Sequence, residues 1–359
     1  MSKTIKLCKG LDIQLQGAAE KKTTVLPLAS TYAVSPLDFE GVTPKMLVKV
    51  GDAVKAGTPL FFNKNNASVV FTSPVSGTVT AVVRGEKRRI LSVEIAADST
   101  IAYEEFATLD VKSASRDQIV ELLLKSGLWT LLIQRPYGII ANPADMPKSI
   151  FVSAFDSAPL APDYNFTLKD EAANLQVAVD VLNKLTKGGV FVGVNGKSAA
   201  NSPFSKLLNV KVYGFSGAHP AGNVGVQINN IAPINKGEVV WTIDPMFMVA
   251  LGKLFTKGIY DVTRTIAVAG NRVEKPCYVT CVPGTQIKDL DFLVSKKEVE
   301  ICDQECGCRY ISGNVLTGNN VGAEGSLDFY SNMVSVISEG NYYEMFGWVK
   351  PIRSKKFSF

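Results

Sequence analysis

The sequence predicts a multidomain protein of the α/β and α+β classes, in which an all-β unit precedes a βαβ unit and a smaller mixed unit. Three patterns along the 359 residues support this prediction. Short apolar runs separated by glycine turns fill the first part. An apolar strand–helix–strand succession occupies the middle, and short strands return near the end. A chain of this length has room for two or three separate cores.

The first unit covers residues 1–105 and is predicted to contain only short strands and turns. Gly51-Asp52 is a strong turn signal between two apolar runs. Residues 48–60, followed by residues 73–79, resemble the barrel-sandwich hybrid of biotinyl and lipoyl domains. Those domains carry a prosthetic group on a lysine at a hairpin tip.

The turn-rich stretch 63–67 contains Lys64, which raises the alternative of a covalent carrier. The Met or Asp that usually stands beside a carrier lysine is missing from this stretch. A purely structural role for the barrel-sandwich hybrid is therefore favoured, and attachment of a group to Lys64 is kept as an alternative.

Residues 106–145 are predicted to form a helical connection. Ser115 and Gln118 have the spacing of a capping box, and Ile119, Leu122 and Leu123 fall on one face of a helix over residues 115–126. Gly127 follows directly, where a left-handed residue commonly ends a helix.

Three residues in loops are candidates for a binding site. Arg135 and Tyr137 stand on either side of Pro136, and His219 is the single histidine of the chain, between an alanine and Pro220. Binding residues concentrate on loops of fixed geometry. A cation and an aromatic ring beside a turn suit a quinone headgroup. Arg135 could equally form a surface ion pair, and Tyr137 could equally be a packing residue. For His219, a structural role is favoured over a chemical one.

Residues 146–260 are predicted to form a Rossmann-like α/β domain. An apolar strand, a helix and a second apolar strand at this spacing indicate a parallel pair with a right-handed crossover. The elements are expected as a strand at 150–155, a helix that Thr167 begins and Gly188-Gly189 stops, a strand at 190–194 and a further helix at 245–257.

Two nucleotide-binding signals in this domain are incomplete. The loop after the first strand, residues 156–160, has no glycine, although a dinucleotide pyrophosphate needs close backbone approach there. Gly196-Lys197-Ser198 ends like a phosphate loop, but Phe191 stands where that motif needs its first glycine. Direct binding of NADH or flavin is therefore disfavoured.

A smaller mixed α+β unit is predicted from residue 261 to 338. Cys302, Cys306 and Cys308 cluster in it, at spacings that match neither the zinc knuckle nor the ferredoxin run. Reduced, free thiols are favoured. An iron–sulfur site on these cysteines is the alternative.

Charge and hydropathy restrict the partners that this chain is expected to have. The net charge is only +5, and basic residues are dispersed apart from residues 84–89 and the tail. A nucleic-acid partner is therefore not expected, whereas an anionic membrane surface or an acidic partner stays open. No run of about 18 apolar residues suits a membrane span, and the N-terminus lacks a signal core, so a cytoplasmic location is expected.

Several strings, in this order, resemble the NqrA family, whose members are subunits of sodium-translocating NADH:quinone oxidoreductases. The resemblance covers essentially the whole chain. The strings occupy residues 9–13, 50–52, 71–74, 125–130, 135–136, 219–222, 312–318 and 346–348.

The resemblance implies a layout related to RnfC and to the flavin-carrying subunit of complex I. A barrel-sandwich hybrid would precede a Rossmann-like domain and then a β-grasp domain of the SLBB type over residues 261–338. Residues 339–359 would begin a truncated C-terminal domain.

The resemblance also implies a peripheral position on the cytoplasmic face of the inner membrane of a bacterium. The partners would be other Nqr subunits, the membrane subunit NqrB first. The complex would couple NADH oxidation and quinone reduction to sodium export. No cofactor is expected on this chain, since NADH, FAD, FMN and iron–sulfur centres would belong to partners, and the isolated chain is expected to be inactive. An RnfC-like flavin or iron–sulfur subunit is the alternative.

Overall fold

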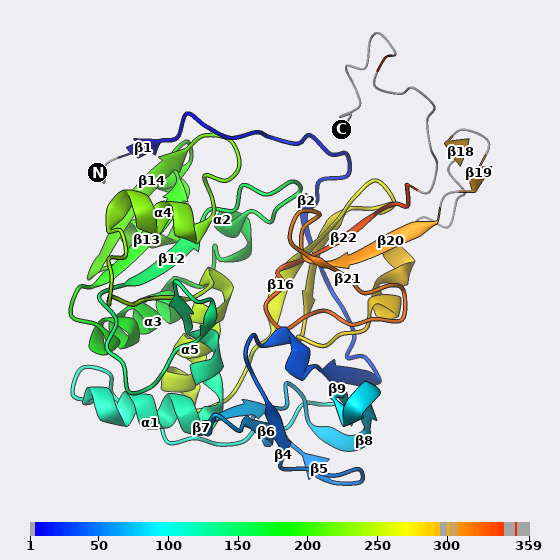
Figure 1. Cartoon of the computed structure of the whole chain (residues 1–359), viewed down its shortest axis with the longest axis horizontal. Coiled ribbons are helices and arrows are strands. Elements are labelled where there is room, and N and C mark those ends of the chain that lie inside the picture. Colours follow the sequence, from blue (N-terminus) through cyan, green and yellow to red (C-terminus); the bar gives the residue numbers. More distant parts are fainter. Residues whose placement is uncertain (1–3, 295–299, 302–303, 306, 341–348, 350–359) are drawn as a thin grey trace.

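Three units make up the fold in the computed structural model, which describes residues 4–294, 300–301, 304–305, 307–340 and 349. They are a seven-stranded sheet with helices, a six-stranded sheet, and a pair of small sheets (Figure 1). We call them the parallel-sheet unit, the six-stranded unit and the sandwich unit. The predicted α/β and α+β multidomain class is confirmed, whereas the predicted domain boundaries stay predictions.

The sandwich unit consists of two small antiparallel sheets that share one apolar core. Phe61 and Phe71 stack in it with ring centroids 4.7 Å apart. Lys64 is exposed in a hairpin turn. One sheet contains β3 (Thr31–Val34), β9 (Ile90–Ala97), β8 (Gly77–Arg84) and β5 (Ala53–Val54), and the other contains β4 (Pro44–Met46), β6 (Pro59–Asn63) and β7 (Asn66–Thr72).

The parallel-sheet unit contains a parallel core that an antiparallel pair extends at one edge. The parallel strands are β1 (Thr4–Lys6), β14 (Val210–Ser216), β13 (Val190–Asn195), β12 (Ile150–Ala154) and β15 (Val240–Thr242), in this spatial order. The antiparallel pair is β10 (Ile133–Arg135) and β11 (Ile139–Ile140).

Helices cover both faces of this parallel core. Val152 and Val192 share a core with α3 (Ala172–Leu185) and α5 (Pro245–Lys257), which also pack on each other. Their chain neighbours Phe151 and Phe191 share a core with Ile228 of α4 (Val224–Ile231). Because successive side chains of a strand point to opposite faces, α4 lies on the face opposite to α3 and α5.

Local capping signals set the ends of two predicted helices. In α1 (Arg116–Ser126) both hydrogen bonds of the capping box form, and Gly127 takes the left-handed conformation. In α5 the Asp244 side chain caps the start, and Gly258 ends the helix. Both predictions are confirmed. Within the described residues, no helix is long and apolar enough to cross a membrane.

The predicted start of the helix before β13 is wrong. Thr167 is the last residue of a separate short helix, α2 (Tyr164–Thr167), rather than a cap. The Asp163 carboxylate accepts the N–H of Asn165 and begins that helix, so α3 starts only at Ala172. Two acceptor side chains competed for the same stretch, and the earlier one formed the cap.

The N-terminal segment pairs with strands outside the sandwich unit, although residues 1–105 were predicted to form one unit. Strand β1 pairs in parallel with β14, and β2 (Glu20–Val25) pairs in parallel with β17 of the six-stranded unit. Both pairings join residues about two hundred positions or more apart, which no local pattern encodes. The first 25 residues thereby connect all three units.

The six-stranded unit is a mixed sheet with its own apolar core. Val268, Val279 and Val334 are completely buried in it. In spatial order its strands are β2, β17 (Cys277–Cys281), β16 (Arg264–Ala269), β22 (Met333–Ser338), β20 (Cys308–Ser312) and β21 (Asn319–Asn320). A separate hairpin contains β18 (Glu300–Ile301) and β19 (Gln304–Glu305).

Candidate functional site

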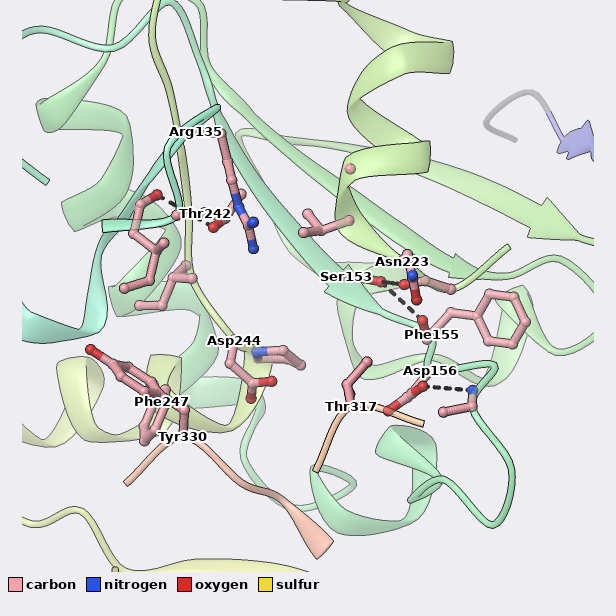
Figure 2. Close-up of a pocket in the computed structure, with 18 of the residues that line it drawn as sticks. Arg135, Ser153, Phe155, Asp156, Asn223, Thr242, Asp244, Phe247, Thr317 and Tyr330 are labelled. Carbon is pink, nitrogen blue, oxygen red and sulfur yellow. Dashed lines mark hydrogen bonds between the residues drawn. The ribbon is translucent and has the colours of Figure 1, made fainter. Parts of the chain in front are cut away.

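A pocket of about 790 Å³ opens at the carboxyl ends of β12 and β15 (Figure 2). These two strands are parallel neighbours. Strand β12 continues through α3 to β13 over one face of the sheet, whereas β15 is reached through α4 over the other face. The strand order reverses between these two strands, because β13 and β14 lie on one side of β12 and β15, the next strand along the chain, lies on the other. Such a reversal is a topological switch point, where ligands of α/β proteins usually bind. We call this cavity the junction pocket.

All three units line the junction pocket. The sandwich unit contributes Asp38 and Glu40, which precede β4, and the six-stranded unit contributes Asn314, Thr317 and Tyr330 from its loops. The parallel-sheet unit supplies the remaining wall. A ligand in this pocket would therefore contact the three units together.

Arg135 points into the junction pocket from the end of β10 (Figure 2). Among the described residues, its guanidinium group has no hydrogen-bond or ion-pair partner, and its Nε is buried without one. Burial lowers the pKa of Arg135. A half-buried guanidinium group without a partner keeps its N–H donors available for an oxygen atom of a ligand.

His219 also lines the junction pocket, in the loop that precedes α4. Its Nδ1 lies 3.1 Å from Ser157 Oγ. That same oxygen accepts the N–H of Gly222 at 2.8 Å. This arrangement leaves the hydroxyl proton of Ser157 free to donate to Nδ1, so it favours the tautomer with the proton on Nε2. The imidazole then offers a second donor.

Tyr137, the third predicted site residue, does not line the junction pocket. It lies in the turn between β10 and β11, and 71% of it is exposed. The structure thus brings Arg135 and His219 to one cavity and leaves Tyr137 outside. A contact between Tyr137 and a ligand stays a prediction.

Sequence reasoning missed the carboxyl groups of this pocket. Asp244 accepts hydrogen bonds from the Met246 N–H at 2.8 Å, from Asn332 Nδ2 at 2.7 Å and from the Tyr164 hydroxyl at 3.3 Å. Burial nevertheless raises the pKa of Asp244 to about 6. Its place before Pro245, at the start of a predicted helix, was a signal that could have found it.

Asp38 is the second carboxyl group with a strongly shifted pKa. Burial, and then the nearby Asp328, raise the pKa of Asp38 to about 7, although its Oδ2 accepts the Phe329 N–H at 2.8 Å. Burial also raises the pKa of Asp156. The pocket therefore holds carboxyl groups that resist ionisation, because it supplies too little solvation for their charges.

Arg264 fixes the loop of residues 328–332, which closes one side of the pocket. Its guanidinium group donates to the carbonyl oxygens of Phe329 at 2.7 Å and Ser331 at 2.6 Å, and lies over the ring of Phe247. Tyr330 in this loop donates to the Thr130 carbonyl at 2.6 Å. The loop is thereby tied to the parallel-sheet unit as well as to its own sheet.

The predicted cysteine cluster is only partly described. Cys302 and Cys306 lie outside the described residues, whereas Cys308 Sγ accepts a hydrogen bond from Arg272 Nε at 3.2 Å. In the part of the chain that the structure describes, no group of three or more His, Cys, Asp or Glu side chains could hold a metal ion.

Comparisons with protein families cover most of the chain. Residues 5–98 match the NqrA N-terminal barrel-sandwich hybrid domain, residues 114–260 the NqrA second alpha/beta domain, and residues 265–323 the NQRA C-terminal domain, an SLBB domain. The chain belongs to the NqrA family. Both the predicted family and the predicted types of domain are confirmed.

Individual family members are similar over almost the full chain. The NqrA subunit of the Na(+)-translocating NADH-quinone reductase of Neisseria meningitidis serogroup A is 37% identical over 350 residues, which are 97% of this chain and 76% of that relative. The corresponding subunit of Yersinia pestis is 37% identical over 356 residues, 98% of this chain and 77% of the relative. No finding favours the RnfC-like alternative.

Among solved structures, an NAD+-reducing [NiFe]-hydrogenase in the air-oxidized state aligns with a TM-score of 0.36 and 13% identity. The alignment covers 54% of this chain and 40% of that chain. A similarity at this level supports no conclusion about function.

Proposed function

We propose that this chain is the NqrA subunit of a Na+-translocating NADH-quinone reductase and that its junction pocket binds the headgroup of a quinone. Membership of the family supports the first part. The observation that carries the second part is Arg135, a partnerless guanidinium group among the described residues, in a pocket at the switch point of the sheet.

A quinone headgroup suits the chemistry of this pocket. It is neutral, planar and carries two carbonyl oxygens that accept hydrogen bonds. Arg135 and His219 Nε2 offer the donors, while Ile133, Phe247 and Tyr330 supply apolar walls. The volume of about 790 Å³ falls in the range of small-molecule pockets. Anionic ligands fit less well, because four carboxyl groups line the same cavity, namely Asp38, Glu40, Asp156 and Asp244.

In this proposal the chain contributes position and electrostatics, and partner subunits contribute redox chemistry. NADH oxidation, FAD, FMN and iron–sulfur centres belong to other Nqr subunits, and the isolated chain has no reductase activity. The membrane subunit NqrB is the first partner, and the chain lies at the cytoplasmic face of the inner membrane of a bacterium.

Tryptophan fluorescence gives a direct test. Trp129 and Trp241 are buried with rings 5.4 Å apart, and Trp241 precedes Thr242 of the pocket wall. Ubiquinone-1 bound there should quench this pair. We expect Arg135→Met to weaken the affinity about tenfold or more, since a hydrogen bond to a charged group contributes roughly 1.5–3 kcal/mol.

The matched control is Arg84→Met, which removes the same charge at an exposed site on β8. It should bind ubiquinone-1 like the unchanged chain. Equal affinity for both variants, with unchanged circular dichroism, would show that the headgroup does not bind at Arg135.

A further inference from the structure

The turn between β8 and β9 carries four basic residues within six positions. Arg84, Lys87, Arg88 and Arg89 are all exposed, and the stretch contains a single acid, Glu86. None of the four basic side chains forms an ion pair in the described part of the chain. We call residues 84–89 the basic tip.

The backbone of the basic tip is unusual for the residues that occupy it. Lys87 and Arg88 have φ angles of 53° and 61°, and Arg89 N–H donates to the Glu86 carbonyl at 3.1 Å. These features define a tight turn with two consecutive left-handed residues, which Asn-Gly normally occupies. Two long basic side chains therefore stand where the backbone disfavours them. Such a conflict points to a role for the side chains themselves.

The composition of the basic tip indicates what it binds. Residues 84–89 include no aromatic or aliphatic side chain, whereas protein interfaces depend on such anchors in dry pockets. Nucleic-acid sites extend the charge along a stripe and add aromatic rings. A compact group of exposed cations instead suits a surface with many mobile anions, and guanidinium groups pair with phosphate through two hydrogen bonds.

We propose that the basic tip docks this chain on an anionic phospholipid surface. Strands β8 and β9, which the tip connects, lie at the opposite end of the molecule from β1 and β14 (Figure 1). This contact is independent of the junction pocket. It would add a direct lipid contact to whatever attachment partner subunits provide.

Vesicle co-sedimentation of the full chain tests the proposal. We expect binding to vesicles of phosphatidylcholine with about 30% phosphatidylglycerol, no binding to pure phosphatidylcholine, and weakening as salt rises. Replacing all four basic residues of the tip by glutamine should weaken partitioning about tenfold or more. The matched control replaces four exposed lysines of the same unit by glutamine, namely Lys45, Lys49, Lys55 and Lys64. It should lower partitioning less than about threefold.

Three outcomes would overturn the proposal. One is no binding to phosphatidylglycerol vesicles at low salt. Another is an equal loss in the tip and control variants, which would indicate an effect of net charge rather than of the tip. The third is tighter binding to a short DNA duplex than to the vesicles at the same salt, which would assign the tip to nucleic acid.

Discussion

The junction pocket and the basic tip use charge in opposite ways. In the pocket, the carboxyl groups of Asp244 and Asp38 accept hydrogen bonds from fixed partners, and burial shifts their pKa values upward. At the tip, Lys87 and Arg88 are exposed, and no ion pair restrains them in the described structure. For a buried group, the interaction energy depends on its exact position relative to its partners. For exposed groups, each contributes little, and the total effect depends on how many there are.

This difference predicts which substitutions will lower stability or ligand affinity most. A change at one buried group should alter stability or affinity strongly, because no water replaces the lost partner. A change at one exposed group should alter little by itself, because water and salt already screen its charge.

Arg264→Leu should have the largest effect. Arg264 is completely buried apart from 3% of its surface and donates to three carbonyl groups of the loop 328–332. Its removal leaves the Phe329 and Ser331 carbonyls without the Arg264 donor, whereas the Asp328 carbonyl still accepts the Ser331 N–H. We expect a cost of about 3 kcal/mol or more in the free energy of unfolding. The midpoint of urea unfolding, followed by tryptophan fluorescence, measures this loss.

Arg309→Leu is the control for that experiment. Arg309 forms an exposed ion pair with Glu339, with Nε 2.9 Å from a carboxylate oxygen. Exposed pairs contribute at most about 1 kcal/mol, so its midpoint should barely move. Similar midpoints for the two variants would contradict a structural role of Arg264 at the junction.

Asp38→Asn should change how stability depends on pH. In the folded chain the pKa of Asp38 is about 7, above its ordinary value of 3.8. Between these two pH values the folded state retains a proton that the unfolded state releases, so the free energy of unfolding falls as pH rises. The variant should therefore gain about 2 kcal/mol over the unchanged chain between pH 5 and pH 8, a figure discounted because Asp38 is not fully buried.

Urea unfolding of both proteins at pH 5 and pH 8 measures that gain. Glu40→Gln removes an exposed carboxyl group two residues away and serves as the control, with an expected change near zero. A gain for Asp38→Asn that is no larger at pH 8 than at pH 5 would show that burial does not shift Asp38.

Ser157→Ala should have an intermediate effect on the junction pocket. It removes the hydroxyl group that holds His219 Nδ1, and it also leaves the Gly222 N–H without its partner. We expect a loss of about 1 kcal/mol in stability and a several-fold weaker quenching by ubiquinone-1. Tyr137→Phe, at the exposed turn, should leave quenching within about twofold. A larger loss of quenching for Tyr137→Phe than for Ser157→Ala would indicate that ubiquinone-1 binds near the turn between β10 and β11 instead.

Local signals in the sequence predicted much of the fold. Capping residues act on neighbours a few positions away, so Gly127 and Gly258 fixed two helix ends correctly. The pairing of β1 with β14 and of β2 with β17 depends on packing across the whole chain, so no local pattern contains it. The prediction that Thr167 begins a helix is wrong for a different reason, because Asp163, four residues earlier, caps a separate short helix.

The residues of the candidate site also fall into two groups, those that local sequence signals indicate and those whose role depends on tertiary packing. Arg135 and His219 stand beside prolines in loops, which made them visible as candidates. Asp38 has no such mark, since its role arises only when residues near position 329 pack against it. Its raised pKa is a property of that tertiary burial and of Asp328 nearby, not of the residues beside it in the chain.

The smallest effect on stability is expected at the basic tip. Two double variants there separate the effect of backbone preference from the effect of charge. Lys87→Asn combined with Arg88→Gly installs the pair that prefers this turn, and should raise stability by up to about 1 kcal/mol. Lys87→Gln combined with Arg88→Gln removes the same charge without relieving the backbone, so stability should not rise. Both pairs should weaken binding to phosphatidylglycerol vesicles equally, because they remove the same two cations. If only the Asn-Gly pair weakened binding, binding to the vesicles would depend on the shape of the turn rather than on its charge.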